Sequence, residues 1–148
     1  MKTISVNLTI IGKIHSPYLS PSDVPLKKTD NIFTIEIEKE FMKGLTDLEG
    51  FSHLHIFYWL HKSTGFSLMV YPPWDKKPHG LFATCSPHRP NPVAHCVVEC
   101  IEIKKNFLYV KGLDAIQGTP VIDIKPYIKK NDCKPDAACG WLNQVDLK

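Results

Sequence analysis

The chain has 148 residues, 43% hydrophobic and 22% charged, with a formal net charge of +3 at pH 7, which fits one globular domain with its own core. No apolar run reaches the roughly 18 residues of a membrane-spanning helix, and the start of the chain lacks the apolar stretch of a signal peptide. Five cysteines without even spacing favour reduced thiols, so we expect a cytoplasmic protein with no attachment to a membrane.

The first half of the chain predicts two strands separated by a long loop. Residues 5–14 and 32–38 alternate apolar and polar side chains, which places one face of each strand on a core and the other in water. Residues 15–31 contain too many prolines and serines for a helix. Residues 38–45 predict one or two helical turns that end at Gly44.

The second half of the chain also predicts mostly strands. Residues 51–61 are nearly all large side chains and predict a strand covered on both faces. Residues 70–79 form a basic, aromatic loop. Residues 95–103 and 107–113 read as a hairpin, and residues 121–126 as a last short strand. Five to seven short strands with little helix indicate a mainly β fold, a small closed or nearly closed β-barrel with short helices and long loops.

The domain organisation predicted from these elements is simple. The sequence shows no internal repeat, low-complexity tract or linker, so we assign residues 1–130 to one β-barrel domain. Residues 131–148 are expected to form a C-terminal tail packed on or beside the barrel. A glycine-rich strand-to-helix turn is missing from the sequence, which does not support a doubly wound nucleotide-binding domain. An adenosine cofactor would therefore be held by loops of the barrel.

Residues 80–92 are the most distinctive segment, Gly-Leu-Phe-Ala-Thr-Cys-Ser-Pro-His-Arg-Pro-Asn-Pro. A strand-like stretch, residues 81–84, leads into a loop whose three prolines fix the backbone and hold Arg89 and Asn91 between them. Ordering a flexible loop costs about 1 to 2 kcal/mol per residue, and prolines remove part of that cost before a ligand arrives. The segment therefore predicts a binding loop, and we hypothesise that Arg89 and Asn91 organise a reaction zone.

Four separated motifs resemble the TsaA-like family, also called the TrmO type. They are residues 11–18, 44–54, 80–92 and 112–127, the last reading Gly-Leu-Asp-Ala-Ile-Gln-Gly-Thr-Pro-Val-Ile-Asp-Ile-Lys-Pro-Tyr. The resemblance implies an S-adenosylmethionine-dependent methyltransferase on a small β-barrel that forms a homodimer. In characterised members the substrate is tRNA carrying N6-threonylcarbamoyladenosine next to the anticodon, which is methylated on N6.

The resemblance also implies where the cofactor binds. The residues that it gives to the cofactor pocket are Ser16, Pro17, Tyr18, His53, Leu54, Phe82, Ala83, Cys85, Arg89, Pro92, Gly118, Thr119 and Pro120. The sequence departs from the usual pattern at three places, since Cys85 stands where arginine is usual, Val93–Ala94 where isoleucine and glycine are usual, and Gln117 where aspartate is common. We leave open which group takes the N6 proton, the candidates being Asn91, Asp114, Asp123 and Tyr127.

A metal is not expected, because the methyl carbon of a sulfonium donor carries its own activation and needs only orientation and exclusion of water. His53 and His55 share a strand face and are the weak alternative for a metal site. For the tRNA anticodon loop, the candidate contacts are Lys76–Lys77 beside Trp74, Lys104–Lys105 and Lys129–Lys130, since basic side chains interleaved with aromatic ones suit unstacked bases.

Each of these three lysine pairs, taken alone, is also typical of a solvated surface. The alternative function is a module of the same fold that binds the cofactor but serves another acceptor or acts as a sensor.

Overall fold

The computed structural model describes residues 4–27 and 29–145, and the chain divides into two compact units. Unit 1 comprises Met1–Lys62 and Val93–Tyr127, and unit 2 comprises Ser63–Pro92 and Ile128–Lys148. Each unit is therefore built from two separate stretches of chain. None of the helices in the described ranges has both the length and the apolar composition needed to cross a bilayer.

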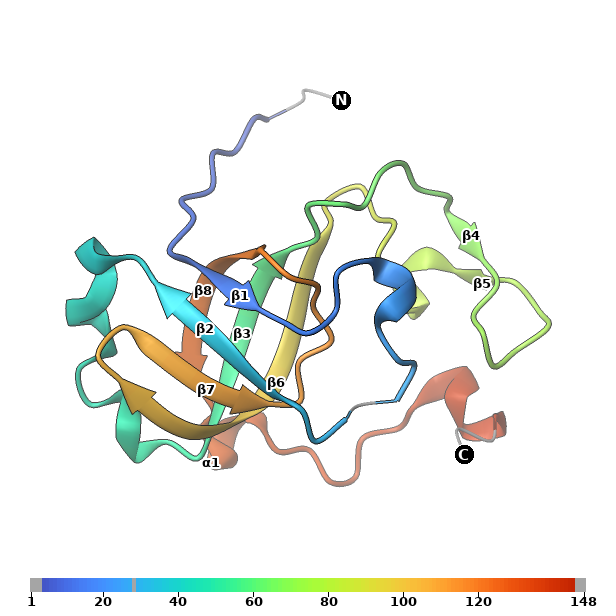
Figure 1. Cartoon of the computed structure of the whole chain (residues 1–148). Helices are drawn as coiled ribbons and strands as arrows, with labels where there is room; N and C mark the ends of the chain where they lie inside the picture. The colour runs from blue at the N-terminus through green and yellow to red at the C-terminus, as the bar shows by residue number, and fades with distance from the viewer. Residues whose placement is uncertain (1–3, 28, 146–148) are drawn as a thin grey trace. The chain divides into compact units, whose positions relative to one another are not determined.

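Unit 1 is a closed antiparallel barrel in the strand order β1-β2-β7-β6-β3-β8 (Figure 1). The strands are β1 (Gly12–His15), β2 (Ile32–Ile37), β3 (His53–Trp59), β6 (Val93–Lys104), β7 (Phe107–Lys111) and β8 (Thr119–Pro126). The described residues of this unit also form three short 3₁₀ helices, η1 (Pro21–Asp23), η2 (Lys39–Leu45) and η3 (Leu48–Gly50). The mainly β barrel predicted from the sequence is confirmed, including the β6–β7 hairpin.

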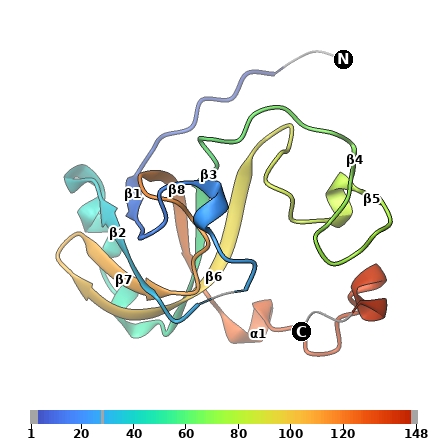
Figure 2. The same cartoon turned by 45° about the vertical axis from the view of Figure 1, so that its right-hand side comes forward.

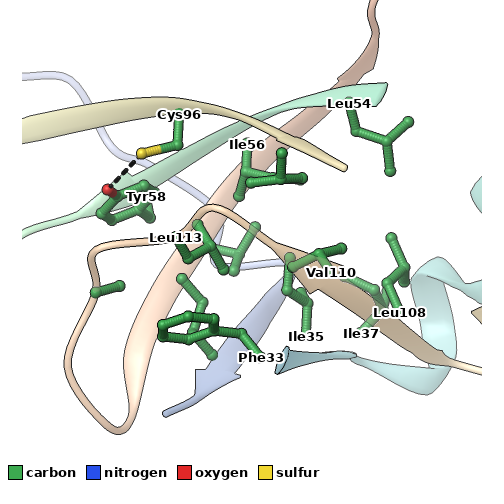
Figure 3. Packing of buried hydrophobic residues seen from close by; sticks show 14 of the residues in the cluster. Phe33, Ile35, Ile37, Leu54, Ile56, Tyr58, Cys96, Leu108, Val110 and Leu113 are labelled. Carbon is green, nitrogen blue, oxygen red and sulfur yellow. Dashed lines mark hydrogen bonds between the residues drawn. The ribbon is translucent and has the colours of Figure 1, made fainter. Parts of the chain in front are cut away.

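The core fills the inside of the barrel (Figure 3). Successive side chains of a strand point to opposite faces, so every second residue of each strand enters the core. In β3 these are Leu54, Ile56 and Tyr58, each no more than 1% exposed. The same alternation buries residues of the neighbouring strands, namely Phe33, Ile35, Ile37, Cys96, Val98, Leu108 and Val110. Each large apolar side chain buried in this way contributes about 1.5 to 3 kcal/mol of transfer free energy.

The strand predicted over residues 5–14 is mostly wrong, because pairing begins only at Gly12. The alternating side chains Ile4, Val6, Leu8 and Ile10 are 83%, 72%, 48% and 43% exposed. Residues 4–10 lead away from the barrel in both views (Figures 1 and 2). The physical reason is the lack of a neighbour, since β2 ends at Ile37 opposite Gly12 and the chain then enters η2.

Three other expectations differ from the structure in detail. The strand predicted over residues 51–61 is β3, whose outer face is half-buried or exposed, because a closed barrel has one inner face only. Residues 81–84 are not a strand but the 3₁₀ turn η4 (Leu81–Ala83), in which Leu81 is buried and Phe82 is 75% exposed. The helical turns predicted over residues 38–45 exist as the 3₁₀ helix η2 and end at Leu45.

Unit 2 contains a two-stranded sheet of β4 (Met69–Val70) and β5 (His79–Gly80), the turn η4, the helix α1 (Lys129–Asp132) and the 3₁₀ helix η5 (Gly140–Gln144). Trp141 fastens the C-terminal stretch to the rest of the unit. Its ring stacks on the His79 imidazole with 3.9 Å between centroids, and its indole N–H donates to the Ala83 carbonyl at 2.9 Å. The His79 Nε2 in turn lies 2.8 Å from an Asp75 carboxylate oxygen.

Candidate cofactor and substrate site

One end of the barrel in unit 1 brings together two of the segments predicted to bind the cofactor. Ile14 of β1 pairs with Thr119 of β8, so the loop after β1 and the turn before β8 leave the barrel side by side. The Ser16 backbone N–H donates to the Gln117 side-chain oxygen at 2.7 Å. The Gln117 backbone N–H donates to the Tyr18 carbonyl at 2.7 Å. These bonds tie residues 16–18 to residues 117–119.

An open depression of about 420 Å³ lies over this end and is lined by His15, Ser16, Pro17, Asn31, Ile32 and Gln117. Its volume falls in the range of about 300 to 1,000 Å³ that small-molecule sites occupy. The lining residue Asn31 is held in place by Tyr18, whose hydroxyl accepts from the Asn31 amide at 3.0 Å and bonds to Thr29 Oγ1 at 3.2 Å. The depression is therefore large enough for part or all of a nucleoside cofactor.

A cluster of three polar side chains closes the same end of the barrel from within. The Tyr58 hydroxyl donates to Asp114 Oδ1, and Cys96 Sγ lies 3.3 Å from that hydroxyl and 3.4 Å from the same carboxylate oxygen. Figure 3 shows the Tyr58 hydroxyl directed at Cys96 at the edge of the apolar core. Burial, followed by the neighbouring Cys96 and Asp114, raises the pKa of Tyr58 far above its ordinary value. The phenol consequently remains a hydrogen-bond donor.

His53 and Leu54 lie at the other end of β3, so the structure does not bring them to Ser16 and Gly118 within one barrel. His53 and Trp59 are six positions apart along β3, about 20 Å of strand at 3.3 Å per residue. Leu54 is fully buried in the core. The His53 ring lies 6.1 Å from the ring of Tyr127 on the outer face. Their part in cofactor binding stays a prediction.

The proline-braced loop belongs to unit 2, where Arg89 holds the loop's own backbone. One guanidinium nitrogen, Nη1, donates to the carbonyls of Leu81, Thr84 and Ser86 at 3.3, 2.9 and 3.4 Å. The guanidinium carbon also lies 5.7 Å from the centroid of the exposed Phe82 ring. Nε and Nη2 make no hydrogen bond to any residue in the described ranges. Arg89 therefore organises the loop with one nitrogen, and the donors of its other two nitrogens remain available.

The other loop residues predicted to bind are accessible. Ala83, Cys85 and Asn91 are exposed, and Pro92 is half-buried. Cys85, in the place where the resemblance leads us to expect arginine, is a free thiol. A thiol supplies no charge-assisted donor. The guanidinium of this loop therefore comes from Arg89, which is the one arginine of the whole sequence.

Sequence reasoning missed the association of Tyr58, Cys96 and Asp114, although one signal was present. Tyr58 falls on the inward face of an alternating strand, and a buried tyrosine hydroxyl usually has a hydrogen-bond partner. The partner itself comes from a loop more than fifty residues later, which no local pattern reveals.

Sequence reasoning also missed a row of rings on the outer face of the barrel. Phe57 stacks on His95 at 4.7 Å, His95 on His55 at 5.0 Å, and His55 contacts Tyr127 at 5.4 Å between centroids. Within the described residues, no group of three or more histidine, cysteine, aspartate or glutamate side chains is arranged to hold a metal ion.

Comparison with known proteins gives a consistent result. The family model described as the tRNA-methyltransferase O N-terminal domain matches residues 13–133. The chain is 46% identical over 143 residues to a probable S-adenosyl-L-methionine-binding protein of Archaeoglobus fulgidus, covering 95% of this chain and 39% of that protein. It is 41% identical over 92 residues to the human tRNA (adenine(37)-N6)-methyltransferase, covering 60% of this chain and 21% of that protein.

A solved structure is also similar. The crystal structure of TrmO from Pseudomonas aeruginosa aligns with a TM-score of 0.78 at 30% identity, covering 93% of this chain and 62% of that one. The chain thus spans 39% of the Archaeoglobus relative and less than two thirds of this TrmO chain.

Proposed function

Because the chain belongs to the tRNA-methyltransferase O family, we propose that it transfers the methyl group of S-adenosylmethionine to N6 of an adenine in tRNA. The observation that carries this proposal is the family match over residues 13–133, which includes both segments at the barrel end and the whole proline-braced loop. The acceptor is N6-threonylcarbamoyladenosine next to the anticodon, and the enzyme acts as a homodimer. A tRNA substrate would place the reaction in the cytoplasm.

The residues at the barrel end suit the cofactor. The depression beside Ser16 and Gln117 has the volume of a small-molecule site, and hydrogen bonds already fix its walls. Residues 16–18 and 118–120 would hold the cofactor there. When bound, S-adenosylmethionine supplies a methyl group on a positively charged sulfur. The chain's own part is to orient the acceptor nitrogen at about 3 to 3.5 Å from the methyl carbon and to exclude water.

Arg89 is proposed to bind an anionic group of the substrate or the carboxylate of the cofactor. A guanidinium presents a planar fork that binds carboxylates and phosphates through two bonds, which a lysine cannot reproduce. The remaining cations of the chain are all lysines. The single arginine is therefore the residue best suited to this contact.

Methyl incorporation into tRNA tests the proposed reaction directly. The full chain is incubated with radiolabelled S-adenosylmethionine and with total tRNA from cells that make N6-threonylcarbamoyladenosine but do not methylate it. The nucleosides are then separated and identified by mass spectrometry. We expect label in N6-methyl-N6-threonylcarbamoyladenosine. Transfer RNA from cells that cannot make the threonylcarbamoyl group serves as the control and should stay unlabelled.

The alternative is a module that binds the cofactor without acting on this nucleoside, and the free thiol of Cys85 in place of the usual arginine favours it. Cofactor binding together with unlabelled tRNA would support that alternative and would overturn the proposed acceptor. Label in a small molecule of a cell extract would also support the alternative and overturn the proposed acceptor.

Replacement of Arg89 tests the role of the loop. Arg89→Ala is expected to lower kcat/KM by about 100-fold or more, because it removes both a ligand donor and the bonds that order the loop. Arg89→Lys, which keeps the charge but not the fork, should recover only a small part of the rate. The thermal unfolding of the barrel should be unchanged. Unaltered turnover in Arg89→Ala would remove this residue from the site.

A further inference from the structure

We propose that Asp114 is the catalytic base of the methyl transfer, and that Tyr58 and Cys96 are positioning residues that fix its carboxylate. This inference rests on the proposed function, because the base takes the proton that the acceptor nitrogen must lose. It assigns a role to a cluster that lies outside every segment proposed above to hold the cofactor.

The geometry leaves one carboxylate oxygen available. Both donors of the cluster, the Tyr58 hydroxyl and the Cys96 thiol, are directed at Oδ1 of Asp114. Oδ2 makes no hydrogen bond to any residue that the structure describes. Tyr58 and Cys96 are 1% and 6% exposed, whereas Asp114 is an exposed residue. The carboxylate is therefore held from inside the barrel and faces solvent with its other oxygen.

The position of the cluster matches the proposed cofactor site. Tyr58 pairs with Val121 of β8, and Gly12 of β1 pairs with the same residue, so the cluster lies at the level where β1 and β8 pair. Asp114 itself lies in the connection from β7 to β8, a few residues before Gln117, which lines the depression. The base and the proposed cofactor segments thus share one end of one barrel.

The other candidates for the base fit less well. The Asp123 carboxylate is bound by the Lys125 ammonium on the outer face of β8. Tyr127 follows the far end of β8, where its ring lies against His53 and His55. Asn91 carries an amide, which accepts a hydrogen bond but does not take up a proton at neutral pH. Among the four candidates, Asp114 is the one ionisable group at the cofactor end.

The proton transfer balances the reaction. The N6 lone pair forms the new bond to the methyl carbon while the carbon–sulfur bond breaks, and its electron pair neutralises the sulfonium as a thioether. The nitrogen would be left positively charged, and Asp114 Oδ2 takes its proton to give a neutral carboxylic acid. A nitrogen bearing a carbamoyl group is a weak nucleophile, so removal of this proton is the assistance that the reaction needs.

Tyr58 and Cys96 contribute by orientation. The Tyr58 pKa is raised by burial, then by Cys96 and Asp114, so the hydroxyl stays protonated and donates throughout the working pH range. A carboxylate held by two donors presents its free oxygen in one direction. Catalysis depends on this direction, because proton transfer needs the acceptor within hydrogen-bond reach of the proton.

Asp114→Asn and Asp114→Gly test the base, with Asp123→Asn as the matched control. General-base catalysis typically contributes about 100-fold to 10,000-fold, so we expect both Asp114 variants to lose at least 100-fold in kcat. Binding of S-adenosylmethionine, measured by calorimetry, should be unchanged and also shows that each variant is folded. Added formate should restore part of the activity of Asp114→Gly, and Asp123→Asn should retain the wild-type rate.

The positioning residues have a separate readout. Tyr58→Phe and Cys96→Ala should lower kcat without changing KM for tRNA, whereas Cys96→Ser, which keeps a donor, should retain the rate. If an Asp114 variant does not fold, the variants of Cys96 and Tyr58 still test the inference. Equal rates for Cys96→Ala, Cys96→Ser and Tyr58→Phe would overturn it.

The wild type separates the two levels of the proposal. A wild-type chain that leaves tRNA unmethylated would refute the proposed function itself. An active wild type together with an equally active Asp114→Asn would refute only the role of the base, as would the failure of formate to change the rate of Asp114→Gly.

Discussion

At the residue scale, Gly12 illustrates how close backbone contact restricts one position of the barrel. Gly12 pairs with Ile37 on one side and Val121 on the other. A Cβ atom at this position would lie 2.3 Å from the Glu36 carbonyl oxygen and 3.0 Å from a side-chain carbon of Ile37. A glycine inside a strand often marks such an approach. The carbonyl belongs to a strand of the closed barrel and has little freedom to retreat.

Gly12→Ala is therefore expected to lower the free energy of unfolding by about 1 to 3 kcal/mol, the usual cost of overpacking. Urea denaturation followed by fluorescence measures the change. Gly44→Ala is the matched control, because a Cβ there meets no atom within 4 Å, and it should leave the stability equal or slightly higher. Equal midpoints for wild type and Gly12→Ala would show that the two strands separate easily.

Gln117 shows where residue-level prediction from the sequence reaches its limit. The sequence alone presents it as a departure from the aspartate that is common in the family. In the structure its amide oxygen accepts the Ser16 backbone N–H at 2.7 Å, and an aspartate, with a side chain one methylene shorter, also carries acceptor oxygens. The substitution therefore preserves an acceptor, and only the partner, 101 residues away along the chain, makes this visible.

At the element scale, the alternation of side chains predicted the faces of strands but not their partners. It identified β2, which finds a neighbour on each side in the closed barrel. Residues 5–10 show the same alternation without a neighbouring strand in the described structure, and they stay outside the barrel. Periodicity reports which side chains share a face, whereas pairing depends on contacts that are distant in sequence.

The β6–β7 hairpin carries a testable local strain at Lys105. This residue has a φ angle of +56°, a conformation that costs a non-glycine residue about 1 to 2 kcal/mol. Lys105→Gly removes this conformational cost, but glycine loses more backbone entropy on folding, which offsets part of the gain. We therefore expect Lys105→Gly to raise the free energy of unfolding by up to about 1 kcal/mol. Lys104→Gly, at the end of β6, is the control and should lower it. A lower urea midpoint for Lys105→Gly would contradict this explanation.

At the scale of the whole molecule, the sequence predicted a barrel and a tail but not the composition of unit 2. The structure groups the C-terminal stretch with residues 63–92 through the Trp141 contacts to His79 and Ala83. Such contacts have no periodic signature, because they join a single indole to a loop some sixty residues earlier. The same holds for the proline-braced loop, residues 80–92, whose order was predicted from its prolines but whose internal bonds from Arg89 were not.

The distribution of charge leads to a prediction for tRNA binding, which also rests on the proposed function. A net charge of +3 is small for a protein that binds a polyanion, so local groups of lysines have to supply the phosphate contacts. Lys76 and Lys77 are exposed near the 42% exposed ring of Trp74, and neither ammonium forms an ion pair with a described residue. By contrast, the Lys13 ammonium lies 3.1 Å from Glu36.

We expect the affinity for tRNA to fall with salt and the double variant Lys76→Gln, Lys77→Gln to weaken this dependence. Each phosphate contact adds about 0.7 to 0.9 to the slope of log K against log salt concentration, so the loss of two contacts should reduce the slope by about 1.4 to 1.8. Fluorescence anisotropy between low and moderate salt measures it. Lys13→Gln should leave the slope unchanged, and an unchanged slope in the double variant would mean that the phosphates are contacted elsewhere.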